Sequence, residues 1–251
     1  MTDNTTPAAL LARWDAQQTA YIRHRADRFD ALVRALVLHC GARPRVLDLA
    51  CGPGSLTRQV RAALPEAEIV AVDKDPVLLA LAEDVFADDG RITTRAADLD
   101  DPRWLDELGS FDAVVSSTAL HWLTPTALVR LYFALTGALR PGGIFLNADH
   151  LLYDATSNPA LRDLAAADDT DNQESSFAAG AEDWDAWWAA VTALPRYADQ
   201  MAAREQCWAD HTTPPVKVSL GFHLETLRNA GFTEVGTLWQ YLDDYVIAGV
   251  R

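Results

Sequence analysis

The sequence predicts an α/β fold built on a doubly wound, mostly parallel seven-stranded sheet. Short apolar runs alternate with stretches long enough for a helix, a pattern typical of a parallel sheet covered on both faces. The first five runs are residues 45–49, 68–72, 91–96, 111–116 and 143–148. Two further runs, 234–240 and 244–250, lie close together near the C-terminus, which predicts a strand pair at the edge of the sheet.

Helices are expected on either side of each strand. From Trp14 to His39 the apolar residues recur at helical spacing, which predicts one or two helices before the first strand. The next helices are expected at residues 55–63, 76–86, 125–139 and 222–230, and Pro141-Gly142-Gly143 is expected to close the third of them. Residues 151–220 contain no strong strand, so we predict a helical insertion between the fifth and sixth strands.

The charge balance narrows the class of protein. The formal net charge is -15, from 36 acidic and 21 basic residues, and such a surface repels the phosphate backbone of nucleic acids. Three cysteines, Cys40, Cys51 and Cys207, lie far apart and indicate neither a disulfide framework nor a zinc site. Neither a secretory signal nor a membrane span is recognisable, so a cytoplasmic protein with no membrane partner is expected. A homodimer is left open.

The first strand runs directly into a glycine turn. Asp48 ends the strand region, Gly52 and Gly54 follow, and the second strand ends at Asp73, 19 residues after Gly54. A carboxylate at that place is positioned to bind the two hydroxyls of a ribose, and the two glycines are expected to leave room for the ligand. The nicotinamide fingerprint requires a third glycine where Thr57 stands, so a nicotinamide oxidoreductase is disfavoured.

The spacing of Asp48, Gly52 and Gly54 resembles the first motif of the class I S-adenosylmethionine-dependent methyltransferases, although Ala50 replaces the usual glycine. The resemblance implies a Rossmann-like fold, S-adenosylmethionine as cofactor and an antiparallel hairpin at the C-terminal edge. It also implies that the turn, with Ala50 and Cys51, cradles the methionine part. Asp48 would help to fix the ammonium through water, and Asp73 would hold the ribose.

The same resemblance extends the cofactor site to Lys74, Asp98, Leu99 and Ser116, and to Tyr21 and Arg25 in the N-terminal helices. Asp98 would accept a hydrogen bond from the adenine amino group, and the backbone N–H of Leu99 would meet the ring. A turn or a helix cap is the alternative for Asp98. Arg25 would pair with the methionine carboxylate, and an exposed basic helix face is the alternative.

The candidate catalytic residues follow the fourth and fifth strands. The triplet Leu120-His121-Trp122 resembles the fourth motif of small-molecule methyltransferases such as trans-aconitate methyltransferase, which lies beside the transferring methyl. His121 is therefore a candidate general base, and packing of the loop is the alternative. His150 is a second candidate base or a surface residue. Its neighbour Asp149 points to the opposite face of the strand, so no metal site is predicted.

The insertion contains a stripe of tryptophans. Trp184, Trp187, Trp188 and Val191 fall at helical spacing, so they either seat a helix on the sheet domain or line an apolar acceptor pocket. The predicted acceptor-binding residues are Trp122, Tyr153, Trp184 and Trp188. Residues 151–210 carry 12 acids against three arginines, which suits a polyanion poorly. The acidic run 168–171 is expected to be a solvated loop.

We therefore divide the chain into N-terminal helices over the cofactor site (1–40), an S-adenosylmethionine-binding core (41–150), a helical acceptor lid (151–220) and a C-terminal helix with an edge hairpin (221–251). The predicted function is methyl transfer from S-adenosylmethionine to an oxygen, nitrogen or carbon atom of a small, neutral or cationic and partly apolar metabolite. The alternatives are a non-catalytic nucleoside-cofactor-binding module and a protein-directed methyltransferase.

Overall fold

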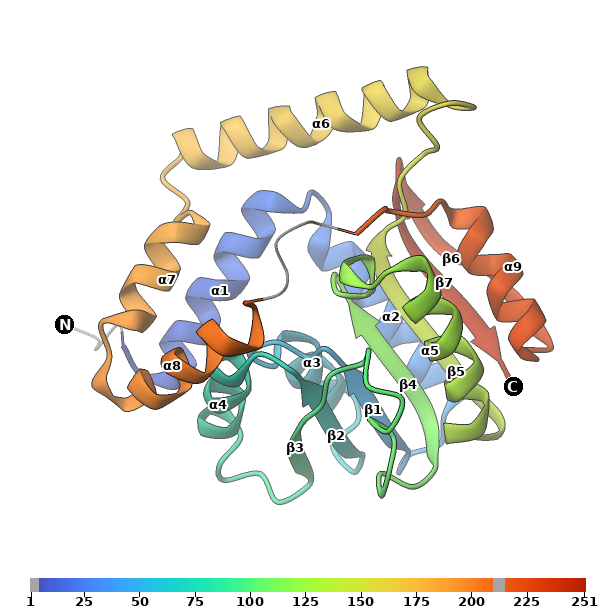
Figure 1. The fold of residues 1–251 in the computed structure, drawn as a ribbon, viewed down its shortest axis with the longest axis horizontal. Coiled ribbons are helices and arrows are strands. Elements are labelled where there is room, and N and C mark those ends of the chain that lie inside the picture. Colours follow the sequence, from blue (N-terminus) through green and yellow to red (C-terminus); the bar gives the residue numbers. More distant parts are fainter. Residues whose placement is uncertain (1–4, 210–214) are drawn as a thin grey trace.

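The computed structural model describes residues 5–209 and 215–251 and is built around one seven-stranded sheet (Figure 1). The strand order is β3-β2-β1-β4-β5-β7-β6. β1 to β5 pair in parallel, whereas β7 is antiparallel to both β5 and β6. This arrangement confirms the predicted fold class. The strands are β1 (Arg45–Leu49), β2 (Glu68–Asp73), β3 (Ile92–Ala96), β4 (Phe111–Ser117), β5 (Leu139–His150), β6 (Glu234–Tyr241) and β7 (Asp244–Val250).

Helices cover both faces of the sheet because the central strands are apolar on both sides. α2 (Arg25–His39) and α3 (Ser55–Ala63) pack against one face through a shared cluster that includes Leu32, Leu56 and Val60. α5 (Pro125–Ala138) and α9 (Leu220–Ala230) cover the other face. α4 (Pro76–Val85) lies beside β2 and β3.

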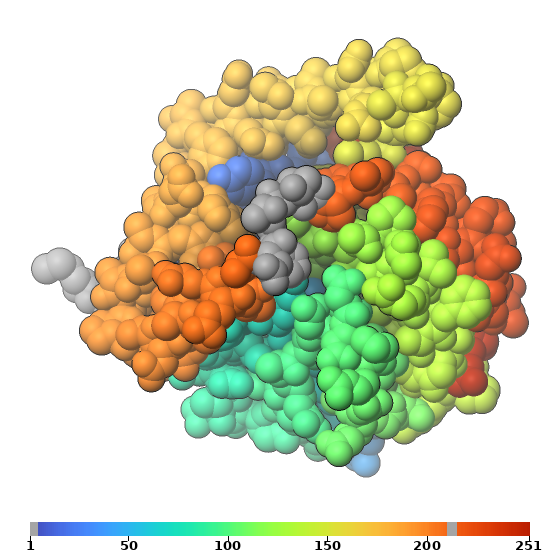
Figure 2. Space-filling model, viewed as in Figure 1, coloured from blue at the N-terminus to red at the C-terminus, as the bar shows by residue number. Residues whose placement is uncertain are grey.

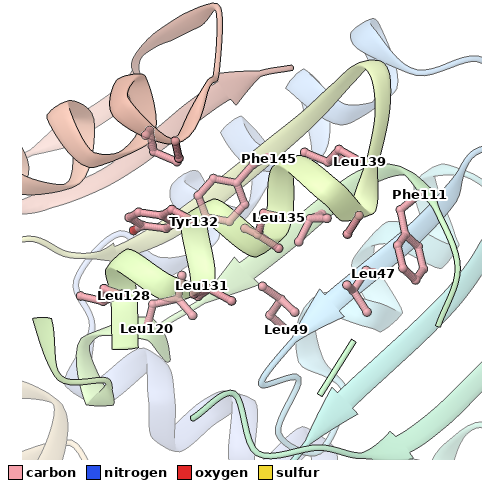
Figure 3. Packing of buried hydrophobic residues seen from close by; sticks show 14 of the residues in the cluster. Leu47, Leu49, Phe111, Leu120, Leu128, Leu131, Tyr132, Leu135, Leu139 and Phe145 are labelled. Atoms are coloured by element: carbon pink, nitrogen blue, oxygen red, sulfur yellow. The ribbon is translucent and has the colours of Figure 1, made fainter. Parts of the chain in front are cut away.

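The packing of α5 illustrates how the second face is built. Its apolar side chains Leu128, Leu131, Tyr132 and Leu135 recur at helical spacing and are all buried (Figure 3). They belong to the same cluster as Phe145 of β5. An amphipathic helix of this kind is held mainly by its apolar face, so α5 fixes the loop that precedes it and follows β4.

β5 is longer than the sequence predicts. It extends from Leu139 to His150 and includes Pro141-Gly142-Gly143, which were expected to close α5. α5 already ends at Ala138, and the pairing of β5 with β4 shifts register between Phe111 and Ala113. Such an irregularity accommodates residues that a regular ladder would exclude.

Among the described residues, three α-helices lie between β5 and α9. They are α6 (Pro159–Ala178), α7 (Trp184–Thr192) and α8 (Ala198–Cys207), and a short 3-10 helix, η2 (Pro195–Tyr197), precedes α8. Figure 2 shows α6 along one margin of the molecule, over α1 (Pro7–Tyr21). α6 buries only Ala165. Among the described residues, no helix has both the length and the apolar composition needed to cross a bilayer.

The acidic run 168–171 is part of α6, so the expectation of a solvated loop is wrong. Arg23, which follows α1, is 2.9 Å from Asp168 Oδ2 and donates to Asp171 Oδ2 at 2.8 Å. Tyr241 of β6 donates to Asp168 Oδ1 at 3.3 Å. A cation and a hydroxyl from distant segments thus offset the repulsion that the acids would cause in an isolated helix.

The tryptophan stripe of α7 seats that helix on α1 and α4. Trp187 and Val191 are fully buried, in one cluster with Trp14 of α1 and Leu81 of α4. The Trp187 Nε1 donates to the backbone oxygen of Leu10 at 3.1 Å. The first of the two sequence interpretations, the seating of a helix, therefore applies to these two residues.

Trp187→Ala should lower the free energy of unfolding by about 3–5 kcal/mol, since it empties a fully buried site and removes the hydrogen bond from the indole to the Leu10 carbonyl. Trp184, on the same helix, is 40% exposed. Trp184→Ala should cost less than about 1 kcal/mol. Urea unfolding of both variants checks the pair, and equal losses would contradict this packing.

Candidate functional site

The site is built where the parallel strands end. The turn after β1 has left-handed φ angles at Ala50 (50°), Gly52 (55°) and Gly54 (95°). The N–H of Gly52 donates to Asp73 Oδ2 at 2.7 Å, and the N–H of Cys51 donates to the Val72 oxygen at 3.0 Å. The turn is therefore held against the end of β2 through the predicted ribose-binding carboxylate.

The two glycines have different roles. A Cβ added to Gly52 would meet no atom within 4 Å, so this side of the turn is open. A Cβ on Gly54 would collide with the ring of Phe86. The space beside Gly52 is therefore open, whereas the place of a side chain at Gly54 is filled by Phe86; the binding of a ligand by the two glycines stays a prediction.

Asp48 is buried behind the turn and accepts a hydrogen bond from Thr57 Oγ1 at 2.6 Å. Burial raises the pKa of Asp48 to about 7, against the effect of the Thr57 hydrogen bond, and the charge of Asp73 adds to the rise. Thr57 occupies the position at which the nicotinamide fingerprint has glycine. The sequence did not identify its role, which is to bind Asp48.

At the ends of β2 and β3 the predicted residues meet. Burial raises the pKa of Asp73 to about 6 despite the N–H donors of Asp75 and Gly52. Lys74 Nζ lies 3.9 Å from Asp98 Oδ2. The other oxygen of Asp98 accepts the N–H of Asp100 at 3.0 Å, as the turn alternative expected. Leu99 packs against the core under β3.

Asp75 is a residue that the sequence interpretation missed. Its side chain caps α4 by accepting the N–H groups of Val77 and Leu78. It also accepts from Arg204 Nε at 2.7 Å and from Trp208 Nε1 at 3.0 Å. The signal in the sequence was the Asp75-Pro76 start of a helix, which indicates the cap but not the connection of α8 to the cofactor edge.

The structure contradicts one of the two interpretations of Arg25. Arg25 is buried and donates to Asp15 Oδ1 at 2.9 Å, so an exposed basic helix face is wrong. Asp15 also accepts from Arg58 at 2.5 Å. Arg25 is thus already paired within the protein. The Tyr21 hydroxyl oxygen accepts the N–H of Trp184 at 3.1 Å, which joins α1 to α7.

The end of β4 is held by two hydroxyl groups. Ser116 is buried, and its hydroxyl donates to the Leu49 oxygen at 3.0 Å, so this side chain braces β4 against β1. Thr118 has a φ of 56°, and its Oγ1 accepts from Arg28 at 2.5 Å. The loop that carries His121 therefore starts from a fixed point.

His121 forms a pair with Asp149 at the end of β5. The ring Nδ1 lies 2.6 Å from Asp149 Oδ1, and the backbone N–H of His121 donates to Oδ2 at 3.1 Å. Burial opposes ionisation of Asp149, but the neighbouring His121, His150 and Arg28 hold its pKa below the usual range. The carboxylate therefore fixes the imidazole ring through one side and leaves Nε2 toward the rest of the site.

His150 lies on the opposite face of β5 from Asp149, as predicted. Its Nδ1 is 3.1 Å from Asp244 Oδ1, which also accepts from the fully buried Arg28 at 2.6 Å. Burial and the charge of Arg28 lower the pKa of His150 to about 4. The imidazole is neutral near pH 7, and it is a weak base. Of the two histidines, His121 is therefore the better candidate for proton removal.

The predicted acceptor-binding residues fall into two groups. Trp122 is 58% exposed with its ring 5.4 Å from that of His121, and the Tyr153 hydroxyl donates to the Leu242 oxygen at 3.0 Å. Trp184 and Trp188 are instead neighbours on α7, with ring centroids 5.8 Å apart. Arg204 of α8 stacks over Trp188 at 4.0 Å.

Four charged residues of the site belong to no sequence motif and were not among the predicted site residues. They are Arg28 of α2, Asp169 of α6, and Asp243 and Asp244 at the β6–β7 turn. Burial and the charges of Asp243 and Asp244 raise the pKa of Asp169 to about 6. Asp169 lies more than 70 residues along the chain from each of the other three, so the sequence alone does not show that they form a cluster.

Two cavities lie away from this edge. One, of about 410 Å³, is between α3 and the end of α4, around Arg61 and Phe86. The other, of about 340 Å³, is around His39 and Gly142, near the start of β1. Neither contains the predicted catalytic residues, so the site is defined by the side chains at the strand ends.

Comparison with known proteins supports a methyltransferase. A family model described as a methyltransferase domain matches residues 46–143. A trans-aconitate 2-methyltransferase of Streptomyces avermitilis is 36% identical over 166 residues, which are 63% of this chain and 58% of that protein. One from Mycobacterium ulcerans is 36% identical over 48% of this chain and 43% of its own length. The chain thus spans about half the length of these curated relatives.

Solved structures show the same fold. Human N-acetylserotonin methyltransferase in complex with SAM aligns with a TM-score of 0.57 at 15% identity, over 100% of this chain and 60% of that one. Magnesium protoporphyrin IX methyltransferase from Synechocystis PCC 6803 with bound SAH aligns with a TM-score of 0.58 at 14% identity, over 99% and 97%.

The matched domain and the strand order together define a methyltransferase fold. Residues 46–143 thus match the methyltransferase-domain family, and the whole described chain shares the fold of solved S-adenosylmethionine-dependent methyltransferases.

The raised pKa of Asp48 has a consequence for stability. A carboxyl group whose pKa is higher in the folded state stabilises the protein below its unfolded pKa, and this contribution is lost as the pH rises through the folded value, here about 7. Asp48→Asn removes this ionisation. Between about pH 5 and pH 8 the free energy of unfolding of the variant should therefore fall by a few kcal/mol less than that of the wild type. Urea unfolding of the ligand-free protein measures it.

Asp89→Asn is the matched control for that experiment. A hydrogen bond from Arg61 lowers the pKa of Asp89, so this group stays ionised throughout the same pH range. Its replacement should change the unfolding free energy equally at both pH values. An unchanged pH dependence in Asp48→Asn would show that Asp48 ionises without cost in the folded protein.

Proposed function

We propose that this protein transfers the methyl group of S-adenosylmethionine to a small, neutral or cationic and partly apolar metabolite. The observation that carries the proposal is the joint placement of two features at one edge of the sheet. Asp73 and the open turn at Gly52 suit a nucleoside cofactor, and the nearby His121–Asp149 pair suits proton removal.

The residues present fit the cofactor. Asp73 uses its oxygens to accept the N–H groups of Gly52 and Asp75 and retains further lone pairs for ribose hydroxyls. Burial raises the pKa of Asp48, and an ammonium group beside it, directly or through water, would favour its charged form. When bound, S-adenosylmethionine supplies an electrophilic methyl group on a sulfonium.

The protein's own residues then align and deprotonate the acceptor. Asp149 holds the Nδ1 side of His121, so Nε2 accepts the proton of an acceptor hydroxyl or amine. Bound S-adenosylmethionine would supply the methyl group for an in-line displacement by the acceptor lone pair. Alignment of the acceptor by these residues would lower the barrier by as much as about 7–11 kcal/mol. His150 and Asp244 are placed on the other face of β5 and are not assigned to this proton transfer.

The charge of the site supports an acceptor that is not a polyanion. Two of the nearby cations are already paired, Arg28 with Asp244 and Arg23 with Asp168 and Asp171. A third, Arg162 of α6, donates to the Tyr153 backbone oxygen at 3.2 Å. Trp122 and Tyr153 supply apolar surface beside His121 and the hairpin turn.

A panel of acceptors tests the reaction. Amines, phenols, monocarboxylates, trans-aconitate and a basic peptide are incubated with S-adenosylmethionine, and S-adenosylhomocysteine is quantified. We expect product with small amines or phenols. Preferential methylation of trans-aconitate or of the peptide would refute the acceptor class, and absence of product with retained cofactor binding would favour a non-catalytic binding module.

Asp73→Ala should weaken cofactor binding by about 1.5–3 kcal/mol in calorimetry.

His121→Ala should lower kcat by roughly 10²–10⁴ and leave cofactor affinity nearly constant, because loss of a general base acts on the transition state. Asp149→Asn should lower kcat in the same direction, since it loosens the ring. His39→Ala, in an exposed contact with the Gly142 oxygen, is the matched control and should be silent. A joint loss of stability and cofactor affinity in His121→Ala would assign the ring to packing instead.

A further inference from the structure

Three side chains from separate elements meet beside the catalytic pair. They are His150 at the end of β5, Asp169 in the middle of α6 and Asp243 at the β6–β7 turn. Each offers a ligand atom, and these atoms all lie within 4.8 Å of one another. We propose that these three residues bind a divalent metal ion, which joins α6 to the edge of the sheet. The proposal does not depend on the methyl-transfer reaction.

Asp243 is the most buried of the three proposed ligands. The residue is 5% exposed, and its carboxylate accepts a hydrogen bond from its own backbone N–H. A buried carboxylate is costly unless it is well paired. Its nearest candidate partners are the imidazole of His150 and the carboxylate of Asp169, and a shared cation would satisfy all three groups together.

The surroundings of His150 match those of a metal-binding histidine. Its Nδ1 faces Asp244, whose position is fixed by the buried Arg28, so Nε2 is left for a metal. Ligating histidines usually donate their other ring N–H to a carboxylate in this way.

The charge balance favours a divalent ion over a substrate ammonium group. Asp149 is paired with His121, and Asp244 is paired with Arg28. Asp169 and Asp243 are left as two negative charges whose ligand atoms lie within 4.8 Å of each other and therefore repel. One divalent cation neutralises two charges, whereas an ammonium group neutralises one.

The ligand set selects the kind of metal. One imidazole and two carboxylates suit borderline first-row ions, with the remaining positions filled by water. Metal–ligand bonds are about 2.0–2.2 Å long, so two of them span up to about 4.4 Å, which is close to the 4.8 Å limit on the separations of the three ligand atoms. α6 buries only Ala165, so it is the element best able to shift toward the sheet. Metal binding should therefore fasten α6 beside the acceptor position.

Titration of the full-length, cofactor-free protein with MnCl2 and with ZnCl2 tests the site. Calorimetry should show one site per chain, and the thermal midpoint should rise with metal and fall again with EDTA. Asp169→Asn and Asp243→Asn should each weaken the affinity at least about tenfold. Asp163→Asn removes an exposed acid of the same helix and should bind as the wild type does.

Asp169→Asn should not destabilise the metal-free protein, because it removes a repelled carboxylate, so loss of binding in this variant is separable from misfolding. Equal affinities in Asp163→Asn and Asp169→Asn would overturn the proposal, since they indicate diffuse binding to an acidic surface. Stabilisation by methylammonium chloride through Asp169 and Asp243, with no saturable binding of either metal, would also overturn it and assign the cluster to an acceptor ammonium group.

Discussion

The parallel pairing of β1 to β5 is the constraint on which the site depends, because it brings the carboxyl ends of these strands to one edge of the sheet. β7 is reversed, and its first residue, Asp244, pairs with His150, the last residue of β5. The hairpin turn therefore delivers two further acids to the same edge. Residues that belong to five separate elements thereby become neighbours, and three of the connecting turns contain a non-glycine residue with a left-handed φ, at Ala50, Thr118 and Leu242.

A buried ion pair joins the layers at this edge. Arg28 projects from α2 and bonds both Asp244 of β7 and Thr118 after β4. Burying two charges is unfavourable unless each is well paired, and here the carboxylate also contacts His150. The geometry of this pair sets the orientation of β7 relative to the loop that carries His121.

The helices between β5 and α9 are attached by different forces. α7 is fixed by apolar burial of Trp187 and Val191, whereas α6 is held mostly by polar contacts such as those of Arg23 and of Asn172, which donates to the Ala20 oxygen. Polar contacts at a surface are worth less than a buried apolar side chain. α6 is thus the part of the insertion suited to respond to a ligand at the acceptor side.

The sequence by itself determined the strands, most helix boundaries and the residues of the glycine turn, because these depend on local periodicity and on spacing within a single βαβ unit. It also placed Asp73 and His121 correctly at strand ends. Only the tertiary structure decided which side chains interact with one another at the site. The contacts of Asp149 with His121, of Arg28 with Asp244 and of Asp243 with His150 join residues far apart along the chain, and no local pattern records a pairing that arises when β7 docks antiparallel on β5.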